Sequence, residues 1–299
     1  MTDIQTLDLE FHGATELIAS FLVPADGGFI LIDPGPASSF EVVERRVEEA
    51  GYRLQDLRAV FATHVHLDHS GGSGVLAKET GCRVYCHPVG APHLEDPAAK
   101  LLPSAERLYG DKMEPLWGTT VGVPKDQLRK VDDGESVMIC ELEVIGWHTP
   151  GHAIHHVAWQ IGDAVATGDV AGVRFPSATH VLPPLPPPDI DIEKWRQSLD
   201  LLRRLDPDRL LLTHFGAFDD PARHIDELED RLVRWTDIAR RVVANGGDKS
   251  ALGVELVRID EDEMKASEVS AEAAERYRRL CPVKESSVGL YRYCSLARE

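Results

Sequence analysis

The sequence predicts an α/β fold in which helices cover the outer side of a β-sheet. Short apolar or alternating runs bounded by turn residues indicate strands, and stretches with apolar residues three or four apart indicate helices between them. With 299 residues, 43% of them hydrophobic, the chain can bury a large core. After residue 216 charged amphipathic stretches replace the strands. We therefore expect an α/β domain over residues 1–216 and a helical C-terminal appendage over 217–299.

The first part of the chain is predicted to start with strands and to continue with alternating helices and strands. Ser39 is expected to be the N-cap of a helix over about residues 40–50. Gly71-Gly72 allows a tight turn before a second helix, which should end near residue 80. The strands expected here cover residues 4–10, 17–23, 28–32, 59–62 and 82–86.

Residues 87–127 interrupt this alternation with short helical pieces separated by prolines. The pieces carry large apolar side chains, among them Tyr109 and Trp117. An apolar insertion at this point has two interpretations, which can both hold. It forms a wall or lid over the active site, or it serves packing and a contact between subunits of a homo-oligomer.

The second half returns to strands and then becomes helical. Asp191 is expected to cap a helix that Asp206-Pro207 ends. Five prolines around Leu185 predict a stiff extended chain, so residues 174–191 are expected to form the rim of a pocket. The strands expected here cover residues 128–131, 136–140, 142–147, 156–160, 163–167 and 209–212. The C-terminal helices are expected over residues 220–246 and about 270–280, with a short helical piece near 250–258.

Composition excludes several classes of function. A formal net charge of −18 would repel phosphate backbones, so we expect a small-molecule substrate and no nucleic-acid partner. No apolar run approaches the roughly 18 residues of a membrane span, so no membrane association is expected. The N-terminus carries Asp3 where a secretory signal would carry a basic residue. Five cysteines without a Cys-x-x-Cys pair fit reduced thiols, and together these features predict a cytoplasmic protein.

The stretch Thr63–Gly72 holds four potential metal ligands within six residues. If the backbone stays extended after the strand at 59–62, His64 and His66 project to the same side and can chelate one ion. Asp68 and His69 are adjacent and follow where the chain turns, so they suit a second ion better. His and Asp clusters at ligand spacing are typical of metal sites, and a polar loop that is rich in histidine by chance is the weaker interpretation.

This stretch resembles the His-x-His-x-Asp-His signature of the metallo-β-lactamase superfamily. Four further segments resemble the other motifs of that family, in the family's order and between about residues 15 and 216. They are Ile30–Gly35, Thr149–His152, Ala166–Asp169 and Leu212–Gly216. The resemblance implies a four-layer αβ/βα sandwich. It is strongest to stand-alone, mostly uncharacterised hydrolases, because the chain has no obvious basic cluster for glutathione and no flavodoxin-like partner domain.

The resemblance also implies how the ligands divide between two divalent metal ions. His64, His66 and His152 would hold the first ion. Asp68, His69 and His214 would hold the second, and Asp169 would bridge the two, with Asp33 supporting the ligands from behind. Three imidazoles leave an ion with an open position, and a shared carboxylate reduces the repulsion between two cations. Zinc is the first expectation, and iron or manganese fits the same nitrogen and oxygen donors.

Five other residues are candidates for supporting or substrate-binding roles. His156, four residues after His152, is expected to hydrogen bond to a ligand. Arg174 either binds an anionic substrate group or pins the rim, and His180 is a candidate donor in the rim. Tyr109 and Trp117 are candidates for the wall of the pocket.

The resemblance implies a binuclear metal-dependent hydrolase that cleaves a small-molecule ester, lactone or thioester with a metal-bridging hydroxide. In such an enzyme Asp68 and Asp169 would act in catalysis, by orienting the nucleophile and by bridging the metals. A phosphodiesterase using the same site is one alternative. The other is a mononuclear iron oxidoreductase of the persulfide dioxygenase kind, which would use two histidines and the aspartate.

Overall fold

The computed structural model describes residues 3–176 and 178–296, and its centre consists of two six-stranded sheets. Each sheet contains six strands that are consecutive in the chain. The first contains β1 (Gln5–Asp8), β2 (Ala19–Ala25), β3 (Gly28–Ile32), β4 (Leu57–Phe61), β5 (Arg83–Cys86) and β6 (Leu128–Lys130). The second contains β7 (Glu135–Ile139), β8 (Leu142–His148), β9 (Val157–Ile161), β10 (Ala164–Ala166), β11 (Arg209–Leu212) and β12 (Gly216–Phe218). The strands expected from the sequence are confirmed, with boundaries that shift by about one to two residues.

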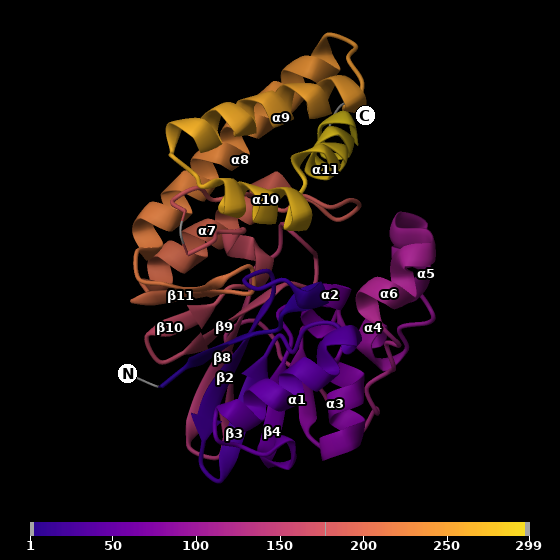
Figure 1. The fold of residues 1–299 in the computed structure, drawn as a ribbon, viewed down its shortest axis with the longest axis vertical. Helices are drawn as coiled ribbons and strands as arrows, with labels where there is room; N and C mark the ends of the chain where they lie inside the picture. Colours follow the sequence, from indigo (N-terminus) through magenta and orange to yellow (C-terminus); the bar gives the residue numbers. More distant parts are fainter. Residues whose placement is uncertain (1–2, 177, 297–299) are drawn as a thin grey trace.

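Apolar side chains from the two sheets meet in the middle of the molecule. The ring of Phe61 in β4 stacks on Tyr85 at 4.7 Å and contacts Trp159 of the other sheet edge-on at 4.9 Å. Strand β3 is buried along its whole length, as expected for a strand covered on both faces. On the outside of the first sheet lie α1 (Phe40–Glu49) and α3 (Ser73–Thr80) (Figure 1). The structure therefore confirms the α/β sandwich.

The N-cap residue predicted from the sequence is confirmed for one helix and not for another. Asp191 caps α7 (Ile192–Leu205), because its Oδ1 accepts a hydrogen bond from the backbone N–H of Lys194 at 3.1 Å. Ser39 precedes α1 but makes no capping bond with its side chain. A 3₁₀ turn over Ala37–Ser39 leads into that helix, so the backbone of Ser39 is already partly wound.

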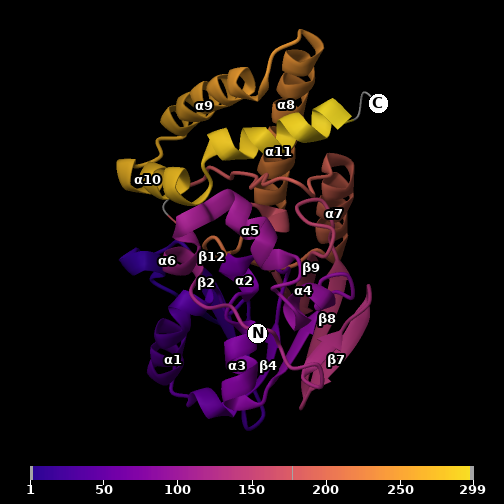
Figure 2. The same cartoon turned by 90° about the vertical axis from the view of Figure 1, so that its right-hand side faces the viewer.

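The insertion forms three short helices beside the first sheet. These are α4 (Ala91–Glu95), α5 (Leu101–Tyr109) and α6 (Met113–Trp117). Two views show α5 and α6 next to α2 (Leu67–Ser70), the one-turn helix in the histidine-rich stretch (Figures 1 and 2). The insertion thus borders the edge of the sheet at which the candidate ligands lie.

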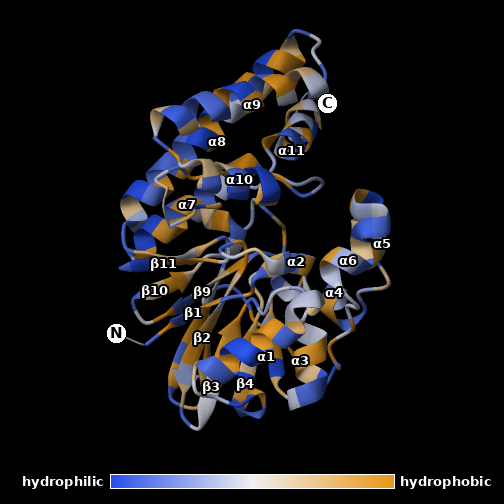
Figure 3. Ribbon diagram, viewed as in Figure 1, coloured by the Kyte–Doolittle hydropathy of each residue, from blue (hydrophilic) through white to orange (hydrophobic). Residues whose placement is uncertain are grey.

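Four helices at the C-terminus lie at one end of the sandwich (Figure 1). They are α8 (Pro221–Ala244), α9 (Lys249–Ala266), α10 (Ala271–Leu280) and α11 (Val283–Leu296). Hydrophilic and hydrophobic residues alternate along α8 and α9, as in amphipathic helices (Figure 3). Strand β12 extends the second sheet to Phe218, and the first of these helices begins at Pro221. Helix α9 is also longer than the short piece expected near residues 250–258, and the sequence did not predict α11.

Two predictions from composition can be compared with the structure. Within the described residues, no helix is both long and apolar enough to cross a membrane. Cys82 and Cys86 lie in the core, and each of the five cysteines, all of which are described, is a free thiol.

Candidate metal centre

The candidate ligands lie at the ends of strands, where the two sheets meet. Strand β4 ends at Phe61, and a loop with a bend at Thr63 leads to His66, whose backbone is extended, before α2 begins. His64 and His66 therefore come from this loop, and Asp68 and His69 come from the turn of helix that follows. The loop is fixed between the sheets, because the carbonyl of Thr63 accepts a hydrogen bond from the Val157 N–H at 2.7 Å.

Three other loops bring the remaining ligands to the same place. His152 follows β8 in a turn that contains Gly151, whose φ of 138° suits glycine. A Cβ on Gly151 would lie 2.3 Å from the Cα of Trp195, so only glycine lets this turn pack against α7. Asp169 lies in a 3₁₀ turn (Gly168–Ala171) shortly after β10, and His214 follows the end of β11 closely.

The first group of donors consists of His64, His66, His152 and Asp169. The Nδ1 of His66 is 2.9 Å from the Nε2 of His64 and 3.1 Å from the Nε2 of His152. The Oδ2 of Asp169 lies 3.2 Å from the same Nε2 of His152. One donor atom from each residue lies within 4.8 Å of all the others, a spacing at which they could hold one ion.

The second group consists of Asp68, His69 and His214. The Nε2 atoms of the two histidines are 3.2 Å apart, and Asp68 Oδ2 lies 3.7 and 3.4 Å from them. The other oxygen of Asp169, Oδ1, lies 3.2 Å from His69 Nε2 and 3.5 Å from His214 Nε2. Asp169 therefore presents one carboxylate oxygen to each group. It is placed as a bridging residue would be.

The hydrogen bonds behind the second group show why a cation fits it. The Nδ1 of His69 faces the Oδ2 of Asp33 at 2.8 Å, and the Nδ1 of His214 faces the carbonyl of Leu17 at 2.9 Å. Both oxygens can only accept, so both Nδ1 atoms carry the proton. In the neutral rings the two Nε2 lone pairs then face each other at 3.2 Å. Asp169 Oδ1 is also buried without a hydrogen-bond donor among the described residues. The site thus offers lone pairs and a carboxylate oxygen where a metal ion would sit.

A family model described as the metallo-β-lactamase superfamily matches residues 15–214, about two-thirds of the chain. The chain belongs to the metallo-β-lactamase superfamily. The match ends at His214, so α8–α11 lie outside it.

Individual superfamily members show how far the similarity extends. The metallo-β-lactamase fold-containing protein ST1585 of Sulfurisphaera tokodaii is 30% identical over 165 residues, or 54% of this chain. The match covers 62% of that protein, less than two-thirds of its length. A hydroxyacylglutathione hydrolase of Acidiphilium cryptum is 28% identical over 276 residues, covering 89% of this chain and 91% of that one.

Solved superfamily structures share the fold over nearly the whole chain. The crystal structure of ST1585 has a TM-score of 0.67 at 22% identity, with 97% of this chain and 98% of that chain covered. A metallo-β-lactamase family protein from Thermus thermophilus, TTHA1429, has a TM-score of 0.72 at 19% identity, covering 99% and 94%.

The electric field differs between the two groups of this superfamily member. Burial, with neighbouring histidines, lowers the pKa of His66 to about 3, and burial also keeps the pKa values of His64 and His152 low. Burial would lower the pKa of His69 and His214 too, but nearby carboxylates, chiefly Asp169, raise both above the usual value. The first group therefore consists of neutral imidazoles, and the second lies in a negative field that favours a cation.

Two of the expected supporting residues lie directly behind the ligands. Asp33 is fully buried and its carboxylate accepts hydrogen bonds from Thr63, His69 and Thr213, at 2.7–2.8 Å. His156 is also fully buried. Its Nδ1 lies 2.8 Å from the hydroxyl of Thr149, and its Nε2 accepts a hydrogen bond from the backbone N–H of Asp169 at 3.2 Å.

Arg174 and His180 lie elsewhere than a substrate-binding role requires. Arg174 donates hydrogen bonds to Asp220 at 2.6 Å and to the carbonyl of Ala178 at 3.0 Å, so it pins the rim, the second of its two interpretations. His180 is fully buried, with Asp260 at 2.8 Å on one nitrogen and Arg231 at 3.1 Å on the other. The expectation that His180 is a pocket donor is therefore wrong, because both nitrogens already have partners inside the protein.

Of the two aromatic candidates in the insertion, Tyr109 is the one whose pKa is affected by a candidate ligand, Asp68. Burial raises the pKa of Tyr109, and the charges of Asp68 and Glu285 raise it further. The residue is also 38% exposed, so its hydroxyl is not sealed inside the protein. Trp117 is almost fully buried, stacked on Phe11 at 5.6 Å and edge-on to Tyr109 at 5.1 Å. Trp117 thus supports Tyr109 from behind, and does not itself form an open wall.

Sequence reasoning missed one kind of group at this site and left the place of another undecided. The backbone carbonyls of Leu17 and Pro184 orient His214 and His152, and no side-chain pattern signals them. The sequence suits His155 equally to a substrate contact and to a surface position. In the structure it is buried, and its ring centre lies 6.1 Å from that of His66. Its Nδ1 has no partner among the described residues. Its place directly after the turn that holds His152 is the signal that could have marked it.

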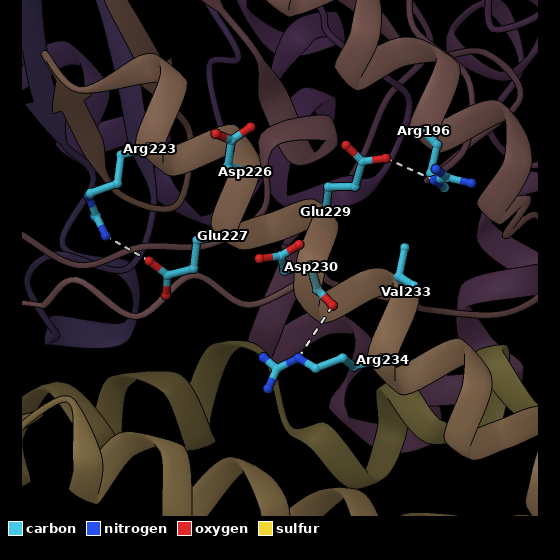
Figure 4. A pocket seen from close by; sticks show the side chains of 8 residues that line it. All are labelled: Arg196, Arg223, Asp226, Glu227, Glu229, Asp230, Val233 and Arg234. Atoms are coloured by element: carbon cyan, nitrogen blue, oxygen red, sulfur yellow. Dashed lines mark hydrogen bonds and ion pairs between the residues drawn. The ribbon is translucent and has the colours of Figure 1, made fainter.

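A hollow lined by residues of α7 and α8 is not part of this centre. Figure 4 shows its lining, in which Arg196 pairs with Glu229 and Arg223 with Glu227. None of the residues that line it belongs to either donor group. The charges in the hollow largely satisfy one another at the surface.

Proposed function

We propose that this chain is a binuclear metal-dependent hydrolase that cleaves an ester, lactone or thioester of a small molecule. The observation that carries the proposal is the arrangement of the two donor groups around the shared carboxylate of Asp169. Zinc is the proposed metal, and iron or manganese would suit the same donors. When bound, the two cations would acidify water to a pKa of about 7 and polarise the oxygen of the substrate.

The residues of the chain would then bind and orient the reactants. Burial raises the pKa of Asp68, but His69 and His214 lower it by a larger amount, so the carboxylate stays ionised. Asp68 is partly exposed, and as an acceptor it can orient the attacking water. Tyr109 keeps its proton, because its pKa is raised, and its hydroxyl can donate to the substrate. Asp33 and His156 would keep the ligands in place.

Acyl substrates are favoured over phosphodiesters for two reasons. The chain carries a net charge of −18, which disfavours polyanions. The Acidiphilium relative, which aligns with 89% of this chain, is named for the hydrolysis of a hydroxyacyl derivative of glutathione. The second donor group, Asp68, His69 and His214, also weighs against a mononuclear iron oxidoreductase, which would not need it.

A substrate panel with defined metals tests this proposal. The metal-free protein is reloaded with zinc, iron or manganese separately, and assayed with thioester, ester, lactone and phosphodiester substrates. We expect turnover of at least one acyl class and loss of that turnover in Asp169→Ala. Turnover confined to phosphodiesters, or oxygen consumption with a persulfide by protein that holds one iron, would replace the proposal with one of its alternatives.

A further inference from the structure

We propose that the C-terminal helices position the candidate metal ligand His152 by holding the backbone of residues 180–185. The inference rests on the metal centre of the proposed function, and it assigns a role to α8–α11, which lie beyond the family match. The residues that would act here are positioning residues, because they reach the centre only through His152.

The link starts at the outer nitrogen of His152. Its Nδ1 lies 2.9 Å from the carbonyl oxygen of Pro184. That oxygen can only accept, so Nδ1 carries the proton and Nε2 presents its lone pair to the first group. Thr63, Asp33 and Leu17 face the outer nitrogens of three other ligands, His64, His69 and His214. The partner of His152 is different, because it lies on a segment that the C-terminal helices hold.

The backbone on either side of Pro184 is held at almost every residue. Tyr277 of α10 donates its hydroxyl to the carbonyl of His180, and Arg231 of α8 donates to the carbonyl of Val181. Further contacts join the Val181 N–H to Glu227 at 3.2 Å, the Pro183 carbonyl to the Cys281 thiol at 3.8 Å and the Leu185 N–H to the Ser286 hydroxyl at 3.4 Å. Helices α8, α10 and α11 and the residue that follows α10 thus hold this short stretch.

A buried charged network fixes the far end of the stretch. Arg231 is almost fully buried and contacts Glu263 at 2.9 Å and the Nδ1 of His180 at 3.1 Å. Since a guanidinium can only donate, the Nε2 of His180 carries its proton and donates to Asp260 at 2.8 Å. Removing Arg231 would leave the buried Val181 carbonyl and the Nδ1 of His180 without this donor, which is destabilising. Variants of Arg231 would therefore mix unfolding with any effect on the centre.

Gly289 of α11 offers a cleaner way to move the stretch. A Cβ at this position would lie 2.1 Å from the carbonyl oxygen of Leu185, the residue after Pro184. Because both partners are main chain, Gly289→Ala must push the segment and helix apart. The Pro184 carbonyl should move with its neighbour and lose its alignment with His152.

The experiment measures the two metal affinities directly. Metal-free protein is titrated with zinc against a chromophoric chelator, and the cobalt-loaded protein is followed by its visible spectrum. In Gly289→Ala we expect one of the two ions to bind about 10- to 100-fold more weakly and the other to be unchanged. Tyr277→Phe, which removes only the hydroxyl, should weaken the same ion by about threefold or more, with a shift of the cobalt spectrum.

Two matched controls come from the C-terminal helices α9 and α11. Gly253→Ala adds a Cβ whose nearest neighbour is the hydroxyl end of Ser287, at 3.1 Å. Tyr291→Phe removes a hydroxyl that donates to the carbonyl of Gly247 at 3.2 Å, away from residues 180–185. Both controls should bind zinc as the wild-type protein does.

The outcomes separate this inference from the proposed function. Wild-type affinities and cobalt spectra in both Tyr277→Phe and Gly289→Ala would overturn the positioning role. So would an equal loss at both ions that parallels a lower melting temperature of the metal-free protein. If Gly289→Ala does not fold, the zinc affinities and cobalt spectrum of Tyr277→Phe alone test the positioning role. A wild-type protein that binds no metal would instead overturn the proposed function itself.

Discussion

Asp169 is the side chain on which both halves of the candidate centre depend. Burial raises its pKa, but His69, His152 and His214 lower it well below the usual range, so the carboxylate is ionised among imidazoles. Its two oxygens face different groups, at 3.2 Å from His152 and 3.2 Å from His69. A change at this residue should therefore affect two metals, whereas a change at His214 should affect one.

We predict that Asp169→Ala lowers the affinity for both ions and abolishes turnover, while His214→Ala mainly weakens the second ion. Each loss should reach at least about 10- to 100-fold in affinity. Replacing a residue that only hydrogen bonds to a metal ligand already has an effect of that size. Zinc titration of the two variants, with the exposed Asp163→Ala as control, measures this. Wild-type activity in Asp169→Ala would show that the bridging assignment is wrong.

His224 should make the protein less stable in acid, although it is not a candidate ligand. It is fully buried, its Nε2 donates to the Ala171 carbonyl at 2.7 Å, and burial lowers its pKa to about 4. The unfolded chain, with an ordinary histidine pKa of about 6.5, then binds more protons between about pH 6.5 and 4. Stability must fall as the pH falls through that window, and it is unaffected by this group above it.

Replacing His224 by Gln should remove this part of the acid sensitivity. We expect the free energy of unfolding of the metal-free variant to fall by about 2 kcal/mol less than that of the wild type between about pH 7 and pH 4.5. Urea unfolding at several pH values measures the difference. Parallel pH profiles for the two proteins would contradict the assignment of a neutral buried imidazole.

At the scale of elements, the insertion α4–α6 has two interpretations that a pair of neighbouring residues can separate. The charge of Asp68 contributes to the raised pKa of Tyr109, which is 38% exposed, whereas Leu108 is 59% exposed. If the insertion walls the substrate pocket, Tyr109→Phe should change kcat/KM or substrate preference with metal content intact. Leu108→Ser should leave the kinetics unchanged.

The opposite pattern would identify the insertion as a subunit contact. In that case Leu108→Ser would shift the oligomeric state on a sizing column, and Tyr109→Phe would leave the kinetics unchanged. Trp117 packs against both Phe11 and Tyr109, so its replacement by Ala would disturb the packing of the insertion in either case. The Tyr109 and Leu108 pair is therefore the more informative one.

The elements also show what a sequence can and cannot predict here. The strands, the histidine-rich stretch and its partners at 152, 169 and 214 were predictable, because each carries a periodic or local side-chain signal. Helix α11 was missed because Gly289 and its serines are weak helix formers, and packing against α8 and α9 holds it. The carbonyl of Pro184 was missed because backbone groups carry no signal in the sequence. His180 was misplaced because its partners, Asp260 and Arg231, are 80 and 51 residues away.

At the scale of the whole molecule, the candidate centre joins parts that are distant in the chain. Its residues come from both sheets, and the N–H of Ala19 in the first sheet donates to the carbonyl of Thr213, which follows a strand of the second, at 2.8 Å. Metal ions bound between such loops would favour the folded chain, because the unfolded chain cannot keep the ligands together. Metal content and global stability should therefore change together.

We predict that the protein binds two metal ions per chain and that a chelator lowers its melting temperature. At a free metal concentration of about 100 times Kd, each ion adds about 2.7 kcal/mol to the free energy of unfolding. Two ions should therefore raise the melting temperature by about 9 °C relative to the chelated protein. Elemental analysis after loading with excess zinc, paired with thermal unfolding, measures both quantities. Asp169→Ala should show little stabilisation by zinc, since it lacks the carboxylate that faces both groups. Saturation of the wild type at one ion would contradict the binuclear centre. A melting temperature that the chelator leaves unchanged would show that metal binding does not stabilise the folded protein.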